Sequence, residues 1–172
     1  HCFIRLTEIS NTLIRHCLDS GATGLIFSTV ETEEQARLIK KLSCFPPNGS
    51  RGLGLVRGNF WGEESLLTRD PILETKAGVD NLEKITNFNF DYYLIGPYDL
   101  SLSLNVPGKF DNEQFLCYIN KVKEKVPESK LAVHIPNDVK NQIHKYKGYG
   151  LKCLGMDTMA LLDYHKEIIK NA

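Results

Sequence analysis

The chain has 172 residues, of which 42% are hydrophobic and 24% charged, values ordinary for one globular domain with a substantial core. Its 21 basic and 21 acidic residues cancel, so charge gives no reason to expect nucleic acid or an anionic membrane as a partner. No apolar run approaches the roughly 20 residues that cross a bilayer.

The five cysteines are scattered along the chain, and no two have the CxxC spacing. This pattern argues against a disulfide framework and against a zinc knuckle. It is typical of proteins in a reducing compartment, and we therefore expect a cytoplasmic protein.

The N-terminal part of the chain alternates short apolar runs with an amphipathic segment. Residues 3–5 and 25–28 are predicted strands. Ser10 is a suitable N-cap for a helix between them, and Gly21 is suited to end it.

A second helix and an irregular, glycine-rich stretch follow. Thr32 and Gln35 have the spacing of a capping box, which predicts that the helix begins here. Periodicity is lost over residues 48–69, and a loop of that length is usually functional or disordered. Arg51 and Arg57 in this stretch either bind an anion or pair with acidic residues.

The central part of the chain reads as strand, helix and strand. Residues 72–74 and 92–95 are the predicted strands, and Gly96-Pro97 breaks the second. Asp80 and Glu83 have the spacing of a capping box for the helix between them.

The C-terminal part continues the alternation. Residues 131–134 and 151–154 are predicted strands. Asp111 with Gln114 is expected to open the helix before the first of them, and residues 137–138 to cap the segment after it. A last amphipathic helix is expected beyond the final strand.

Strict alternation of six predicted strands with helices implies a parallel sheet that has helices outside it. Two architectures fit this pattern, an open doubly wound sheet and most of a (β/α)₈ barrel. Functional side chains collect at the carboxyl ends of the strands in both. The polar residues at or just after those ends are Arg5, Glu74, Asp99, His134 and Asp157.

Glu74 and Asp99 each follow a strand of what reads as one right-handed βαβ unit. If these strands are adjacent, they lie about 4.8 Å apart, and their carboxylates repel unless a proton or a divalent cation lies between them. This arrangement favours a metal site. The alternative is that Asp99 caps a helix beginning at Leu100 and that Glu74 is a solvated loop residue.

Five sequence motifs, in the order in which they occur, are characteristic of one family. They are residues 18–22 (LDSGA), 30–32 (VET), 45–52 (FPPNGSRG), 74–75 (ET) and 95–101 (IGPYDLS). Together they resemble the HpcH/HpaI aldolase and citrate lyase family, and within it the metal-dependent 2-oxo-acid aldolases. The resemblance covers nearly the whole chain, and the order of the motifs is far more specific than any one of them.

The resemblance implies a TIM-barrel, (β/α)₈-type fold, with residues 1–172 forming a single partial domain. It implies that Glu74 and Asp99 bind a divalent cation, Mg²⁺ or Mn²⁺. It implies that Arg5 binds the substrate carbonyl oxygen that becomes an enolate. The family's turn that receives the pyruvate carboxylate, through the amides of its last two residues, matches Gly96, Pro97, Tyr98 and Asp99.

The expected chemistry suits these residue types. An enolate concentrates negative charge on one oxygen, which a divalent cation and a guanidinium stabilise as the charge forms. Two carboxylates are suitable ligands for a hard cation, and arginine offers a planar group that is always charged.

The chain also departs from the family pattern. The family has two further strands before the one that ends in Arg5, and these carry a His–Asp pair for proton transfer. We therefore expect two N-terminal βα units to be absent, and the general base is not identified. His134 is an alternative base, unless it is only hydrogen-bonded locally. Ser28 stands where many members have proline, and Ile72 where some have glutamine.

Three functions are compatible with these residues. The first is a class II, metal-dependent aldolase that cleaves a 4-hydroxy-2-oxo acid to pyruvate and an aldehyde through a metal-stabilised enolate. The second is an acyl-CoA lyase of the citrate or malyl-CoA lyase type, which needs a basic surface for the CoA phosphates. The third is a degenerate fragment that binds a ligand or partner without catalysis. Because the family is usually oligomeric, we expect a homo-oligomer that takes a small 2-oxo acid.

Overall fold

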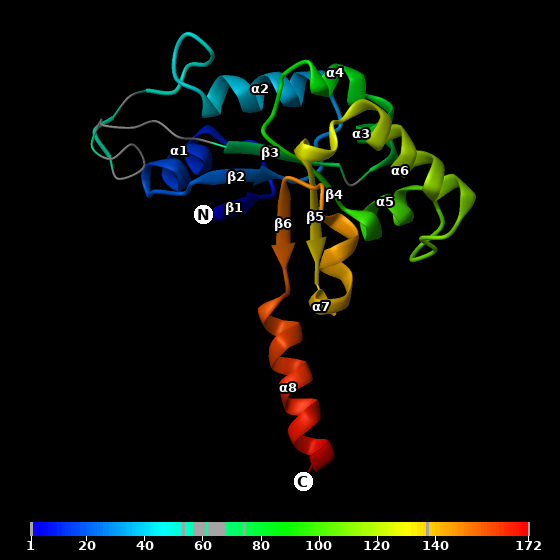
Figure 1. Ribbon diagram of the computed structural model, residues 1–172. Coiled ribbons are helices and arrows are strands. Elements are labelled where there is room, and N and C mark those ends of the chain that lie inside the picture. Colours follow the sequence, from blue (N-terminus) through cyan, green and yellow to red (C-terminus); the bar gives the residue numbers. More distant parts are fainter. Residues whose placement is uncertain are drawn as a thin grey trace.

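The computed structural model describes residues 2–52, 54–56, 61, 68–73, 75–136 and 138–171. Strands and helices alternate along it (Figure 1). The strands are β1 (Phe3–Leu6), β2 (Gly24–Phe27), β3 (Thr68–Leu73), β4 (Tyr93–Ile95), β5 (Leu131–Ile135) and β6 (Leu151–Leu154). The α-helices are α1 (Asn11–Asp19), α2 (Glu33–Ser43), α3 (Lys76–Asp80), α4 (Leu82–Thr86), α5 (Pro97–Ser103), α6 (Glu113–Lys125), α7 (Val139–Gln142) and α8 (Asp157–Asn171). Two 3₁₀ turns, η2 (Glu128–Lys130) and η3 (Ile143–Tyr146), precede β5 and β6.

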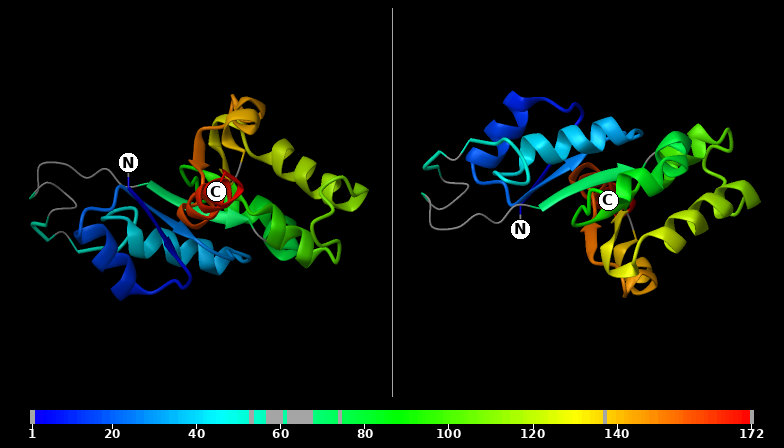
Figure 2. Two further views of the ribbon diagram at one scale, coloured as in Figure 1. Left: turned by 90° about the horizontal axis from the view of Figure 1, so that it is seen from below. Right: turned by 90° about the horizontal axis from the view of Figure 1, so that it is seen from above.

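The strands form one parallel sheet in the order β1-β2-β3-β4-β5-β6, which confirms the predicted parallel sheet. A doubly wound sheet reverses its direction at a switch point, and this order has no reversal. The doubly wound alternative is therefore wrong, and the sequential order is that of a (β/α) barrel. Among the described residues β1 and β6 do not pair, so the sheet stays open (Figure 2).

The two faces of the sheet carry separate apolar clusters. Leu25 and Phe27 of β2 belong to the large cluster that includes the buried residues of α1 and α2. Ile26, between them in the chain, belongs instead to a small cluster with Leu94 and Ala132. Since side chains alternate along a strand, the small cluster marks the face of the sheet opposite the helix layer.

Two predicted helix starts are confirmed by their hydrogen bonds. The hydroxyl of Ser10 accepts from the amide of Leu13, at 3.5 Å, at the start of α1. At the start of α2, the Thr32 hydroxyl accepts from the Gln35 amide while the Gln35 side chain accepts from the Thr32 amide. Such a reciprocal pair satisfies two helix-end donors at once.

The predicted capping box at Asp80 is wrong. Asp80 is the last residue of α3, whose N-cap is Thr75, and no side chain caps α4. The Asp80 carboxylate instead accepts from Lys76 Nζ at 2.7 Å and from the Tyr118 hydroxyl at 3.0 Å. These contacts fix α3 against α6.

The predicted start of α6 is displaced by one residue. The cap is Asn112, whose Oδ1 atom accepts from the amide of Gln114 at 2.9 Å. The sequence placed this role on Asp111, because that residue has the capping-box spacing to Gln114. Both residue types serve as caps, and the backbone conformation selects between them.

Strand β3 begins earlier than its apolar run. The sequence predicted residues 72–74, whereas the strand spans Thr68–Leu73 and pairs with β2 from Gly24 to Phe27. Residues 68–71 have a polar, proline-containing sequence that does not resemble a strand. Pairing with the neighbouring strand therefore extends β3 beyond what local composition indicates.

Helix α8 extends away from the rest of the molecule (Figure 1) and is seen along its axis in Figure 2. Large apolar side chains are exposed along it: Leu161, Leu162, Tyr164, Ile168 and Ile169. None of the helices in the described ranges is long and apolar enough to span a membrane.

Candidate functional site

Arg5 lies in β1, near the carboxyl edge of the sheet. Its Nε atom donates to the Oγ atom of Ser28, which follows β2, at 2.7 Å. The backbone continues the strand pairing here, since the Ser28 amide donates to the Leu6 carbonyl at 3.0 Å. Arg5 is the register partner of Ile26, so its side chain belongs to the face opposite the helix layer. The Arg5 side chain is exposed there.

The Gly-Pro-Tyr-Asp sequence forms the turn from β4 into α5. Gly96 is the N-cap, and Pro97 occupies the first helical position, where its fixed φ suits a helix start. The first helical hydrogen bond runs from the Leu100 amide to the Gly96 carbonyl, at 3.0 Å. The amides of Tyr98 and Asp99 precede that bond, so the helix itself provides no acceptor for them.

Asp99 is exposed in the first turn of α5. Because α5 begins at Pro97, Asp99 does not cap a helix at Leu100, and that alternative is wrong. In the part of the chain that the structure describes, no hydrogen bond or ion pair involves the Asp99 carboxylate. An exposed carboxylate with no internal partner is a suitable ligand for a hard cation.

Glu74, the other predicted metal ligand, lies outside the described residues. Its neighbour Leu73 ends β3 and is the register partner of Ile95, which ends β4. The two strands therefore end together at the edge where the turn into α5 begins. Among the described residues no group of three His, Cys, Asp or Glu side chains is placed to hold a metal ion.

His134 lies in β5 and is hydrogen-bonded locally. Its Nε2 atom lies 3.0 Å from the carbonyl oxygen of Gly155. A carbonyl only accepts, so Nε2 carries the proton in this contact, and in the neutral ring Nδ1 is then the acceptor. This contact confirms the alternative that His134 is hydrogen-bonded locally.

Arg51 pairs with an acidic residue, as one of the two sequence alternatives proposed. Its Nη2 atom lies 2.6 Å from an Asp19 oxygen, and its guanidinium lies 4.7 Å from the centre of the Phe45 ring. The Arg51 side chain is only 2% exposed. Arg57 lies outside the described residues. The Asp19–Arg51 pair joins the end of α1 to the segment after α2.

An aromatic neighbour of the α5 turn was not predicted. The Tyr98 ring packs edge-on against Phe110, with centroids 5.0 Å apart, and Phe110 packs against Phe115 at 5.4 Å. Tyr98 itself is 60% exposed. Phe110 comes from the segment between α5 and α6, and no sequence pattern links it to the turn.

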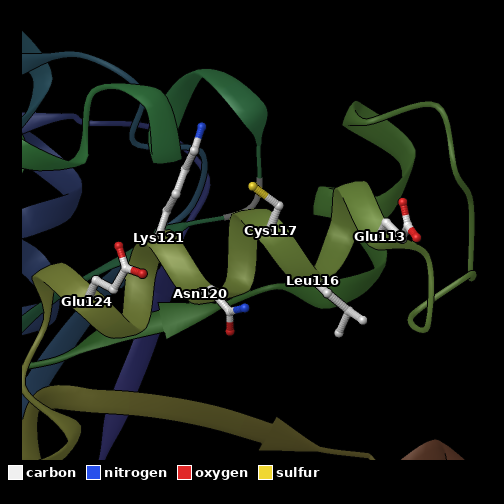
Figure 3. A pocket seen from close by; sticks show the side chains of 6 residues that line it. All are labelled: Glu113, Leu116, Cys117, Asn120, Lys121 and Glu124. Carbon is white, nitrogen blue, oxygen red and sulfur yellow. The ribbon is translucent and has the colours of Figure 1, made fainter.

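A shallow hollow of about 490 Å³ lies elsewhere, along one face of α6 (Figure 3). Its lining has mixed charge: Glu113, Leu116, Cys117, Asn120, Lys121 and Glu124. These residues belong to the outer helix layer and not to the strand ends. Despite the volume of this hollow, we therefore take the sheet edge, where Arg5 and Asp99 lie, as the candidate functional site.

The sequential parallel sheet and the polar residues at its carboxyl edge place the protein among barrel-type α/β folds. The fold is shared with the crystal structure of an HpcH/HpaI aldolase from Desulfitobacterium hafniense DCB-2. That similarity has a TM-score of 0.85 at 21% sequence identity and covers 98% of this chain and 71% of that one.

The sequence model of the HpcH/HpaI aldolase/citrate lyase family matches residues 1–163, and the chain belongs to this family. It is 30% identical to a 2-keto-3-deoxy-L-rhamnonate aldolase of Escherichia coli O6:K15:H31, over 95% of this chain and 66% of that protein. It is 27% identical to a 4-hydroxy-2-oxovalerate aldolase of Rhodococcus jostii RHA1, over 94% of this chain and 67% of that protein. The chain thus spans about two thirds of the length of these relatives.

Proposed function

We propose that the protein is a metal-dependent aldolase that cleaves a 4-hydroxy-2-oxo acid to pyruvate and an aldehyde. The observation that carries this proposal is the position of Arg5 and the Gly96–Asp99 turn at one edge of the sheet, in a chain of the aldolase family. The names of the two relatives support a substrate of this class.

In this reaction a base removes the proton of the C4 hydroxyl, and the C3–C4 bond breaks to release the aldehyde. The bonding electrons move to the C2 carbonyl, which becomes an enolate oxygen, and protonation at C3 then gives pyruvate. Arg5 is proposed to donate to that oxygen, where its charge stabilises the developing anion. Ser28 holds the Nε atom of Arg5 and so helps to orient the guanidinium at the edge of the sheet.

The pyruvate carboxylate is proposed to lie at the start of α5. The amides of Tyr98 and Asp99 have no acceptor within the helix, so a carboxylate there satisfies donors that otherwise need water. Pro97 fixes the turn, so little conformational entropy is lost when the anion binds.

Asp99 and Glu74 are the residues proposed to hold a divalent cation, Mg²⁺ or Mn²⁺. Oxygen ligands fit such an ion, and the Asp99 carboxylate has no internal partner within the described ranges. When bound, the cation would draw electron density from the 2-oxo group and so favour enolate formation.

The acyl-CoA lyase alternative requires cations near the substrate edge. A basic cluster formed by Arg37, Lys40 and Lys41 is present, but it lies at the end of α2. Because α2 runs back from the carboxyl edge after β2, its end lies towards the opposite edge of the sheet. This position favours the aldolase over the CoA enzyme.

We further propose that the protein is a cytoplasmic homo-oligomer in which α8 packs against another copy. Exposed apolar residues such as Leu161 and Ile169, at 60% and 75%, are unfavourable in water on a helix that leaves the body of the molecule. None of the five cysteines forms a disulfide, which supports a reducing compartment.

The test is pyruvate release from a panel of 4-hydroxy-2-oxo acids, with and without Mg²⁺ or Mn²⁺, and with acyl-CoA thioesters in a parallel series. Metal-dependent release that is lost in Asp99→Asn supports the aldolase. Cleavage of the thioesters alone, followed as release of the shorter acyl-CoA, supports the lyase. Metal binding without any turnover contradicts both and supports the non-catalytic alternative.

A further inference from the structure

The end of α2, the turn that follows it and Phe88 line an open, shallow hollow of about 360 Å³. Basic and hydrogen-bonding side chains line most of it: Arg37, Lys40, Lys41, Asn48 and Ser50. The hollow lies towards the amino edge of the sheet, because α2 returns there before β3 begins. It is therefore separate from the edge that carries Arg5 and Asp99, and the inference drawn from it does not depend on the proposed function.

One wall of the hollow is held by backbone hydrogen bonds. The Ser50 amide donates to the Lys41 carbonyl at 2.7 Å, and the Gly49 amide donates to the Phe45 carbonyl at 3.0 Å. A Cβ atom on Gly49 would lie 2.7 Å from the Lys41 carbonyl oxygen, closer than such atoms approach. The turn thus packs directly on the helix end, and the wall is set by the backbone.

The ammonium groups of Lys40 and Lys41 form no ion pair with the described part of the protein. Helix ends attract cations because their last carbonyls lack partners. Here amides cover those carbonyls, since the Cys44 amide donates to Lys40 and the Ser50 amide donates to Lys41. In the described chain no carboxylate pairs with the ammonium group of Lys40 or Lys41. Two neighbouring positive charges with no internal partner repel each other unless an anion binds between them.

Arg37 and Phe88 add a charged and an apolar surface. Arg37 is already paired with Glu33 at 2.6 Å, and its guanidinium lies over the Phe88 ring at 5.4 Å from the centroid. The Arg37 charge is therefore partly compensated. Phe88 is only partly buried, so it offers apolar contact area to the body of a ligand.

We propose that this hollow binds a small phosphate-bearing molecule, with Lys40 and Lys41 on the phosphate and Phe88 against the rest of the ligand. A long polyanion such as nucleic acid is disfavoured, because the net charge is zero and the basic residues occupy one small hollow. A phosphate group accepts charge-assisted hydrogen bonds from both ammonium groups at once.

The test uses inorganic phosphate as the probe, titrated into ¹⁵N-labelled protein without divalent cation and with chloride keeping ionic strength constant. Saturable shifts of the amides of residues 40–50 are expected, and Lys40→Gln/Lys41→Gln should weaken binding about tenfold. The control Lys123→Gln/Lys166→Gln removes the same charge from exposed positions on α6 and α8 and should leave the affinity within twofold. Circular dichroism melting of each variant establishes that it folds.

Asp99→Asn separates this site from the candidate active site. Phosphate binding that persists in Asp99→Asn, and is lost in Lys40→Gln/Lys41→Gln, supports the proposal. Shifts that fail to saturate, or that the control variant weakens equally, overturn it and leave only a diffuse surface charge. Shifts centred on residues 96–100 also overturn it, because they place the anion at the start of α5.

Discussion

The Nε atom of Arg5 lies 2.7 Å from the Oγ atom of Ser28, which joins the ends of β1 and β2. The Ser28 hydroxyl accepts this hydrogen bond, which a residue without a side-chain acceptor could not do. A guanidinium held at Nε keeps its plane fixed relative to the edge of the sheet. The Arg5–Ser28 contact thus bears directly on the role proposed for Arg5.

Replacing Ser28 with alanine should lower kcat about tenfold, because a hydrogen bond to a charged group contributes roughly 1.5 kcal/mol. Affinity for the divalent cation should not change, since Ser28 is not one of the proposed ligands. Steady-state kinetics and calorimetry measure the two quantities. Thr23→Ala is the control, because it removes a hydroxyl from the opposite edge of the sheet, where it accepts from the Cys2 amide. An equal loss in both variants would mean that the effect is general.

Arg5→Lys should lower turnover more than it lowers metal affinity. Lysine keeps the positive charge but loses the planar fork that contacts an oxygen and the Ser28 hydroxyl together. We expect a fall in kcat with little change in KM, as for an interaction made mainly in the transition state. If metal affinity falls by the same factor as turnover, Arg5 has a structural role.

Glu74→Gln and Asp99→Asn should each abolish divalent metal binding. Each amide keeps the shape of the side chain but removes the negative charge that a hard cation requires. Isothermal titration with Mn²⁺ measures the loss. Asp111→Asn is the matched control, since it removes one carboxylate from an exposed position outside the turn. Unchanged affinity in either site variant rules out the proposed metal site.

The sequence predicted those features whose interacting residues are close in the chain. The Thr32–Gln35 capping box and the Ser10 cap were predicted correctly because donor and acceptor lie within one helical turn. Arg5 and Asp99 were placed at one edge by the alternation of strands and helices alone.

Features that depend on distant residues were not predictable in the same way. Asp80 was assigned to a cap because its partner Tyr118, in α6, lies far along the chain. The sequence raised acid pairing for Arg51 but did not identify Asp19 as the acid. Phe110 was missed because nothing in its own segment indicates that it packs on Tyr98. Tertiary packing decides such contacts, and local sequence patterns carry no information about that packing.

Asp19→Ala should destabilise the protein by about 3 kcal/mol or more, because it leaves the buried Arg51 charge without its carboxylate. Among the described residues, the Nε and Nη1 atoms of Arg51 have no hydrogen-bond partner, so few contacts there would compensate for the lost carboxylate. Urea denaturation measures the free energy of unfolding. The double variant Asp19→Ala/Arg51→Met should recover part of the loss, since it also removes the buried charge. Glu33→Ala breaks the exposed pair with Arg37 and should cost only about 0.5 kcal/mol.

The Asp80 cluster should make stability depend on pH at the acidic end. The hydrogen bond from Lys76, with a smaller contribution from the Tyr118 hydroxyl, lowers the pKa of the Asp80 carboxyl below its ordinary value of 3.8. A lowered folded-state pKa means that the stabilisation is fully present above about pH 4, and that it is lost as pH falls through the lowered value. The pair is partly exposed, so solvent screening limits the effect to about 1 kcal/mol.

Asp80→Asn should therefore lower the free energy of unfolding at pH 7, and the difference from the unmodified protein should shrink as the pH falls below 4. Urea denaturation at both pH values measures it, and 1 M NaCl at pH 7 should reduce the difference because the pair is screened. Asp163→Asn on exposed α8 is the comparison variant and should have little effect at either pH. A difference for Asp80→Asn that is equally large at low pH would mean that the side chain acts through its shape and hydrogen bonds, without its charge.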